Sequence, residues 1–187
     1  MRFAIRSTIF LLAILFALGK DTRSEAAMKS RTVRQAGFTV VGIAGRTSNA
    51  KEMTAEGIIS KQWERLMKEA LLSRIPNRMD AAVVAVCTDY ASDKDGEYTY
   101  VLGAKVSSED HVPPGMVAKK VPAGSYVVFT SEKGPVGKVV FETWNKIWSV
   151  PKSNPGGDRA YAADFEVYDE RAADPNNAQV DVYIGIK

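Results

Sequence analysis

The sequence of 187 residues predicts an α+β domain made of a duplicated βαββ unit. Two observations predict it. Stretches of alternating β-forming residues and stretches of helical periodicity follow one another twice in the same order. Matching residues also recur at nearly constant spacing: Trp63 and Trp144 lie 81 residues apart, and residues 101–105 resemble residues 183–187 at a spacing of 82. Two such units are expected to join into a mainly antiparallel sheet with both helices on one face.

The first unit begins with a strand at residues 37–48, where β-forming side chains alternate with small and polar ones. Apolar residues then recur every three or four positions from 54 to 75, which predicts an amphipathic helix that ends before Pro76. Residues 81–90 and 97–107 are predicted to be strands that are joined by a hairpin turn at residues 92–96.

The second unit repeats this order. Residues 116–131 predict a long strand with a bend at Gly124, residues 136–150 a helix, and residues 161–170 and 179–187 two further strands. Trp144 and Trp148 lie one helical turn apart and therefore share a face. They either fill a core or form the wall of a pocket, and the groove between two such units is a place where ligand sites form.

Residues 1–26 are predicted to be a secretory signal peptide. Arg2 and Arg6 precede an uncharged, mostly apolar run at residues 7–19, and small residues follow at positions 24, 26 and 27. The run is shorter than the roughly 20 apolar residues that a membrane-spanning helix needs. We expect cleavage after residue 26 or 27 and a periplasmic or secreted mature protein, without stable membrane insertion, whose domain covers residues 36–187. The alternative is that residues 1–26 are an uncleaved anchor.

Composition argues against several classes of function. The formal net charge is +3, and loss of residues 1–26 would leave about +1, so no basic stripe supports binding to nucleic acid. The sole cysteine, Cys87, lies in an apolar strand pattern and is predicted to be a buried structural thiol. The sole histidine, His111, gives no metal-site spacing, and the sequence contains no phosphate-binding loop. We therefore expect neither a metal nor a cofactor.

Several motifs together resemble those of one family. They are VPAGSYVVF at residues 121–129, the Gly-Pro turn at 134–135, DFEVYDE at 164–170 and VDVYIGIK at 180–187, the last two being the most specific. With the βαββ order they make residues 36–187 similar to the GyrI-like, or AraC effector-binding, domains. The resemblance implies a pocket for small, often cationic and aromatic, molecules, with a glutamate at the position of Glu166. Many family members are fused to a DNA-binding module that this chain lacks, and some stand-alone members resemble hydrolases of strained cyclopropane-type toxins.

Glu166 is the central candidate for the site. Strand alternation places it on the same face as Asp164 and Tyr168, whereas Phe165 and Val167 point to the other face. The resemblance makes Glu166 the predicted acid of the pocket. The predicted ligand-binding residues are Tyr100, Tyr126, Trp144, Trp148, Glu166 and Tyr168.

We therefore expect a stand-alone, exported domain that binds a small lipophilic, aromatic or cationic molecule, because aromatic faces and a carboxylate both attract cations. A second hypothesis is a hydrolase of strained or reactive small molecules that uses Glu166 as general acid or base with help from Tyr100. A third is a protein-interaction module whose pocket is unused. The sequence leaves the ligand and the oligomeric state open.

Overall fold

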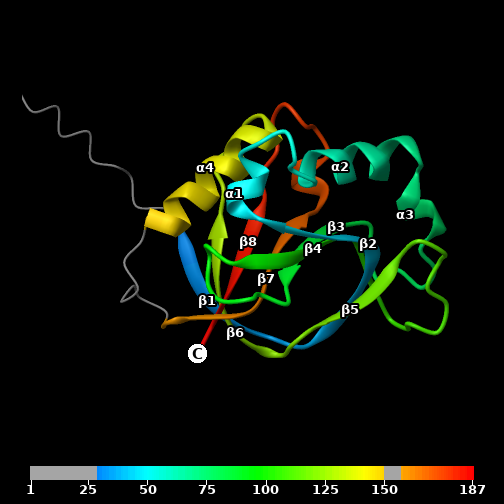
Figure 1. Cartoon of the computed structure of the whole chain (residues 1–187), viewed down its shortest axis with the longest axis horizontal. Helices are drawn as coiled ribbons and strands as arrows, with labels where there is room; N and C mark the ends of the chain where they lie inside the picture. Colours follow the sequence, from blue (N-terminus) through cyan, green and yellow to red (C-terminus); the bar gives the residue numbers. More distant parts are fainter. Residues whose placement is uncertain (1–28, 150–156) are drawn as a thin grey trace, which may run out of the picture.

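The computed structural model describes residues 29–149 and 157–187. In this part of the chain, one eight-stranded sheet carries α-helices on one side (Figure 1). The strands are β1 (Ser30–Gln35), β2 (Phe38–Ser48), β3 (Val83–Thr88), β4 (Glu97–Val106), β5 (Val117–Val121), β6 (Gly124–Thr130), β7 (Arg159–Tyr168) and β8 (Asp181–Ile186). The helices are α1 (Asn49–Glu52), α2 (Ile59–Lys68), α3 (Leu71–Arg74) and α4 (Val136–Ser149), and a 3-10 turn covers Glu170–Ala172.

The order of the strands confirms the predicted α+β fold with its duplicated unit. The sheet runs β1-β6-β8-β7-β3-β4-β2-β5, and each pair of neighbouring strands is antiparallel. In the first unit β4 lies between β2 and β3, and in the second β8 lies between β6 and β7. The two units meet where β3 pairs with β7, with Ala85 opposite Glu166. Glu166 therefore lies next to the pseudo-twofold axis.

The helix predicted at residues 54–75 is two helices. It begins only at Ile59, and it is interrupted at Ala70, whose φ of 47° is left-handed. The interruption turns the chain so that Leu71 and Ile75 become buried in the core. Helical periodicity did not reveal it, because alanine normally favours a helix.

The strand predicted at residues 116–131 is also divided. It separates into β5 and β6 at Pro122, a residue that cannot donate a hydrogen bond to a neighbouring strand. β5 pairs with β2 at one end of the sheet, whereas β6 pairs with β8 near the other end. The sheet curls on its helix-free side: the rings of Phe38 in β2 and Phe165 in β7 lie 5.1 Å apart although β4 and β3 separate their strands.

β1 was not predicted, since its six residues are mostly polar and exposed. It pairs with β6 at the edge of the sheet, where polar residues are common because they discourage pairing with other chains. The predicted signal peptide lies outside the described residues. Among the residues that are described, no helix is long and apolar enough to cross a membrane.

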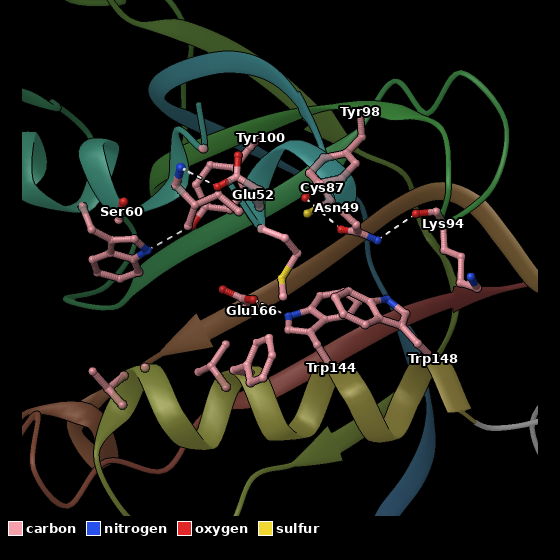
Figure 2. A pocket seen from close by; sticks show the side chains of 18 of the residues that line it. Asn49, Glu52, Ser60, Cys87, Lys94, Tyr98, Tyr100, Trp144, Trp148 and Glu166 are labelled. Carbon is pink, nitrogen blue, oxygen red and sulfur yellow. Dashed lines mark hydrogen bonds between the residues drawn. The ribbon is translucent and has the colours of Figure 1, made fainter. Parts of the chain in front are cut away.

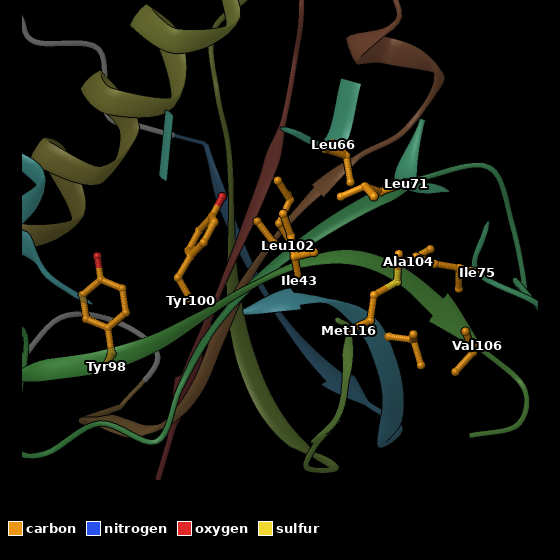
Figure 3. Packing of buried hydrophobic residues seen from close by; sticks show 12 residues of the cluster. Ile43, Leu66, Leu71, Ile75, Tyr98, Tyr100, Leu102, Ala104, Val106 and Met116 are labelled. Atoms are coloured by element: carbon orange, nitrogen blue, oxygen red, sulfur yellow. The ribbon is translucent and has the colours of Figure 1, made fainter. Parts of the chain in front are cut away.

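The helix-facing side of β4 carries buried core residues along its length (Figure 3). Leu102 packs in one cluster with Leu66 of α2 and Leu71 of α3. Tyr98 and Tyr100 lie on the same face nearer the beginning of β4, where they line a cavity. The cluster consists of Val41, Ile43, Leu66, Leu71, Ile75, Ala85, Tyr98, Tyr100, Leu102, Ala104, Val106 and Met116.

Candidate functional site

A cavity of about 520 Å³ lies between the sheet and the helices α1, α2 and α4 (Figure 2). This volume is within the range of small-molecule sites. Figure 2 shows Trp144 and Trp148 on one side of Glu166, and Glu52, Tyr98 and Tyr100 on the other. Both units contribute to its walls, as expected for a site at the pseudo-twofold axis.

The sequence of α4 explains why two tryptophans lie four residues apart. Val139, Thr143 and Ile147 are buried and form one stripe along the helix. Trp144 and Trp148 belong to the adjacent stripe, which faces the cavity, and their ring centroids are 5.8 Å apart. One side of the helix thus anchors it on the sheet while the next provides an aromatic wall.

Tyr100 and Tyr168 form part of the opposite wall, together with Trp63 of α2. The indole nitrogen of Trp63 donates a hydrogen bond of 3.0 Å to the Tyr100 hydroxyl, and its ring meets that of Tyr168 edge-on at 4.7 Å. Burial, followed by the negative charge of Glu166, raises the pKa of both tyrosines well above the usual value. Both hydroxyls therefore remain protonated at neutral pH.

Glu166 projects into this aromatic surrounding and is only 7% exposed. Its Oε1 accepts a hydrogen bond of 2.5 Å from the indole nitrogen of Trp144, and its Oε2 accepts one of 2.7 Å from the hydroxyl of Tyr168. Both donors are uncharged. Among the described residues, no basic side chain lies within ion-pair distance of this carboxylate, so its charge is not compensated.

The electrostatics of Glu166 follow from this geometry. Burial raises its pKa above the ordinary value of a glutamate, and the hydrogen bonds from Trp144 and Tyr168 oppose the rise only in part. Asp164, on the same face of β7, has a different environment. It is fully buried and accepts hydrogen bonds from Tyr90, Arg159 and the backbone N–H of Gly185, so it is paired with a cation. The two carboxylates therefore have different roles.

Two exposed apolar side chains mark the opening of the cavity. Met53, which follows α1, is 71% exposed, and Phe141 on α4 is 47% exposed, and both line the cavity. Large apolar side chains at the edge of a concave site favour the entry of apolar molecules.

The structure brings together most of the residues predicted from the sequence. Tyr100, Trp144, Trp148, Glu166 and Tyr168 all line the cavity.

Tyr126 does not line it. Val127 and Phe129 of β6 pack beneath α4, so Tyr126 points to the opposite face, where its hydroxyl donates to the carbonyl of Pro122 at 3.0 Å. The prediction did not apply strand alternation to β6.

Other cavity residues were not predicted. Cys87 was expected to be buried in the core, but it lines the cavity and is partly exposed there. Trp63 was not among the predicted site residues, although its equivalence to Trp144 in the duplication indicated a matching position at the cavity. No local sequence pattern indicated that Asn49 and Lys94 would reach the cavity, because a short helix carries the first and a turn carries the second. No group of His, Cys, Asp or Glu residues in the described ranges could hold a metal ion.

Comparison with known proteins places the chain in a family. Residues 32–186 match the family described as Cass2, integron-associated effector binding protein. The chain is 39% identical over 149 residues to YobU of Bacillus subtilis, a protein named as a transcriptional regulator, with 78% of this chain and 90% of YobU covered.

Two solved structures share the fold. The integron cassette protein VCH_CASS2 from the mobile metagenome of Vibrio cholerae is 27% identical, with a TM-score of 0.66 over 84% of this chain and 95% of that one. SAV2435, whose structure was determined bound to tetraphenylphosphonium, is 18% identical, with a TM-score of 0.70 over 86% of this chain and 94% of that one. The chain belongs to the Cass2 family of integron-associated effector-binding proteins, which has the GyrI-like fold.

Proposed function

We propose that this protein binds a small, lipophilic aromatic cation in the cavity and that Glu166 provides the charge that selects it. The observation that carries the proposal is a buried carboxylate whose only hydrogen-bond donors in the described structure, Trp144 and Tyr168, are uncharged. An isolated buried charge is unfavourable, and a bound cation would compensate it. The rings around it add favourable cation–π contacts.

Glu52, the other glutamate of the cavity, is less suited to this role. Its carboxylate accepts hydrogen bonds from the backbone N–H groups of Ile58 and Ile59 at the start of α2, at 2.9 and 3.1 Å. It is thus already stabilised by the positive end of the helix dipole. Glu52 holds α1 against α2, whereas Glu166 is available to a ligand.

The similarity to SAV2435 supports the chemical class of the ligand. The tetraphenylphosphonium bound to that protein is an aromatic, lipophilic cation. At 18% identity the similarity extends to the fold, and the transfer of this ligand class depends on the aromatic walls and the carboxylate of the present cavity.

The test is a fluorescence titration with tetraphenylphosphonium. The chain has three tryptophans, and all of them line the cavity, so quenching reports directly on its occupancy. Glu166→Gln keeps the shape and removes the charge. It should weaken binding by about 2 to 5 kcal/mol, the usual cost of truncating a buried charge pair. Glu142→Gln, an exposed change on α4, is the matched control and should bind like the wild type. Equal affinity in wild type and Glu166→Gln would contradict the proposal.

A second candidate is the hydrolase in which Glu166 is general acid or base. It is favoured by the raised pKa of a glutamate that lies within hydrogen-bond distance of the Tyr168 hydroxyl, an arrangement suited to proton transfer. This candidate predicts that an electrophilic ligand is consumed and that Glu166→Gln stops turnover while leaving affinity nearly intact. Product analysis by mass spectrometry during the titration distinguishes the hydrolase from the binding protein. A protein-interaction module would show neither fluorescence quenching nor product.

We also propose that the protein is exported, with the binding domain acting in the periplasm or outside the cell. The support is the sequence pattern of residues 1–26. Intact-mass measurement of the protein from its native cell should give a chain that begins near residue 27. Recovery of the full-length chain in the cytosol would contradict export without affecting the binding proposal.

A further inference from the structure

The cavity has a polar end that the binding of a simple lipophilic cation does not use. We define this polar end by Asn49, Tyr90, Lys94, Tyr98 and Arg159, all of which line the cavity. Figure 2 shows Asn49 and Lys94 on the side of Trp148, and Ser60 on the opposite side of the cavity. Glu166 lies between these sides, so one ligand could contact Glu166 and the polar end together.

Hydrogen bonds fix the position of the polar end. The Tyr98 hydroxyl donates to Oδ1 of Asn49 at 3.1 Å, and Nδ2 of Asn49 donates to the carbonyl of Lys94 at 2.7 Å. The turn between β3 and β4, which carries Lys94, is therefore attached to α1. Because the backbone of Lys94 is held, its side chain extends from a defined point at the cavity.

The two basic side chains of the polar end differ in how firmly they are paired. Arg159 donates to Asp164, which is 0% exposed, and its guanidinium lies 4.4 Å from the centre of the Tyr161 ring. This pair is a fixed part of the wall. Lys94 is 41% exposed and contacts Asp95 at 2.8 Å, which is itself 75% exposed. Exposed ion pairs contribute little free energy, so Lys94 can exchange Asp95 for another anion.

The charges that face the cavity at this end are positive. Lys94 and Arg159 belong to its lining, whereas their partners Asp95 and Asp164 do not. At the other side, Ile59, Val136 and Val140 give an apolar lining. The cavity is therefore polarised: Glu166 lies near its middle and donors lie at one end, while the carboxylate of Glu52, the second acid of the lining, is already bonded to the start of α2.

We propose that the natural ligand is a zwitterionic aromatic molecule. Its cationic group is held at Glu166, and its carboxylate is bound by Lys94. This inference rests on the proposed function, because it adds a second contact to the same ligand. Lys94 becomes the residue that distinguishes such molecules from wholly lipophilic cations.

A matched pair of probes tests the inference. (4-Carboxybutyl)triphenylphosphonium and pentyltriphenylphosphonium have the same cationic group and arms of equal length, and only the first carries a carboxylate. The wild type should bind the carboxylate probe roughly tenfold more tightly, as expected for a partly desolvated hydrogen bond between charged groups. Lys94→Met should abolish this preference, so that the ratio of the two affinities falls to about one, because the carboxylate loses its partner while both probes keep the cationic group that Glu166 binds. Lys119→Met, a change in a similar exposed ion pair outside the cavity, is the control and should keep the preference.

The outcomes separate the two proposals. Equal or weaker binding of the carboxylate probe by the wild type, or a preference that persists in Lys94→Met, would overturn the role of Lys94 alone. Glu166→Gln should weaken both probes to a similar extent. If it weakens neither, or if the wild type binds neither probe, the proposed function fails and this inference fails with it.

Discussion

At the scale of single residues, the unusual feature is the contrast between Glu166 and Asp164. Both are buried and two residues apart on β7, but Asp164 is paired with Arg159 while Glu166 has only uncharged donors. A buried charge without a counter-ion lowers the stability of the ligand-free protein. A binding protein can retain such a group because the ligand provides the missing charge.

This contrast leads to a prediction about stability. Removing the charge in Glu166→Gln should raise the free energy of unfolding of the ligand-free protein at neutral pH by on the order of 1 kcal/mol. The pKa of Glu166 is raised in the folded state, so acidification through that pKa protonates the folded protein first and favours folding through this group. The advantage of Glu166→Gln should therefore shrink as the pH falls towards the pKa of an unfolded glutamate. Urea titrations of the wild type and Glu166→Gln at several pH values measure this difference in the free energy of unfolding. A difference that grows on acidification would contradict the claim that Glu166 is an uncompensated buried charge.

At the scale of elements, α4 and α2 occupy matching places in the two units but are attached differently. Trp63 of α2 reaches across to Tyr100 and Tyr168 and packs against the main core cluster, whereas Trp148 near the end of α4 contacts Trp144 and the cavity. The first tryptophan should serve mainly to hold its helix on the sheet, and the second mainly to contact ligand.

Alanine substitutions should separate these two roles. Trp63→Ala should lower the free energy of unfolding by about 3 kcal/mol, at the lower end for a truncated core aromatic because the side chain is only partly buried. Trp148→Ala should cost less stability but weaken the binding of tetraphenylphosphonium by about 0.5 to 2 kcal/mol, the range of a cation–π contact. Denaturant titrations and calorimetric binding measure the two quantities. A larger loss of stability in Trp148→Ala would show that the roles are assigned wrongly.

The elements also show where sequence patterns are sufficient. Runs of β-forming residues and helical periodicity predicted β2, β3, β4, β7, β8 and α4 within a few residues, because the local pattern of each element is uninterrupted. They did not predict the break at Ala70 or the separation of β5 from β6. Both features depend on contacts with parts of the sheet that are distant in the sequence. β1 had no apolar pattern to detect, because it lies at the edge of the sheet.

At the scale of the whole molecule, the duplication explains why a site forms at all. The units meet at β3 and β7, and the helices of both units lie on the same side of the sheet, so a cavity remains between them (Figure 1). Helical spacing predicted that Trp144 and Trp148 share a face, and strand alternation predicted the face of Glu166, but it was the resemblance to the effector-binding family that made Glu166 the predicted acid of the pocket. Residues that reach the cavity from turns and short helices, such as Asn49, Met53 and Lys94, depend on the tertiary fold and could not be predicted from local spacing.

The central claim is that the charge of Glu166, rather than the aromatic walls alone, selects the ligand. The most direct measurement compares methyltriphenylphosphonium with triphenylphosphine oxide, a neutral molecule with the same three phenyl groups, by calorimetric titration of the wild type and Glu166→Gln. We predict that the wild type prefers the cation by at least about thirtyfold, which corresponds to roughly 2 kcal/mol, and that Glu166→Gln loses this preference while still binding the neutral molecule. Equal affinity of the wild type for both molecules, or an unchanged preference in Glu166→Gln, would contradict the claim.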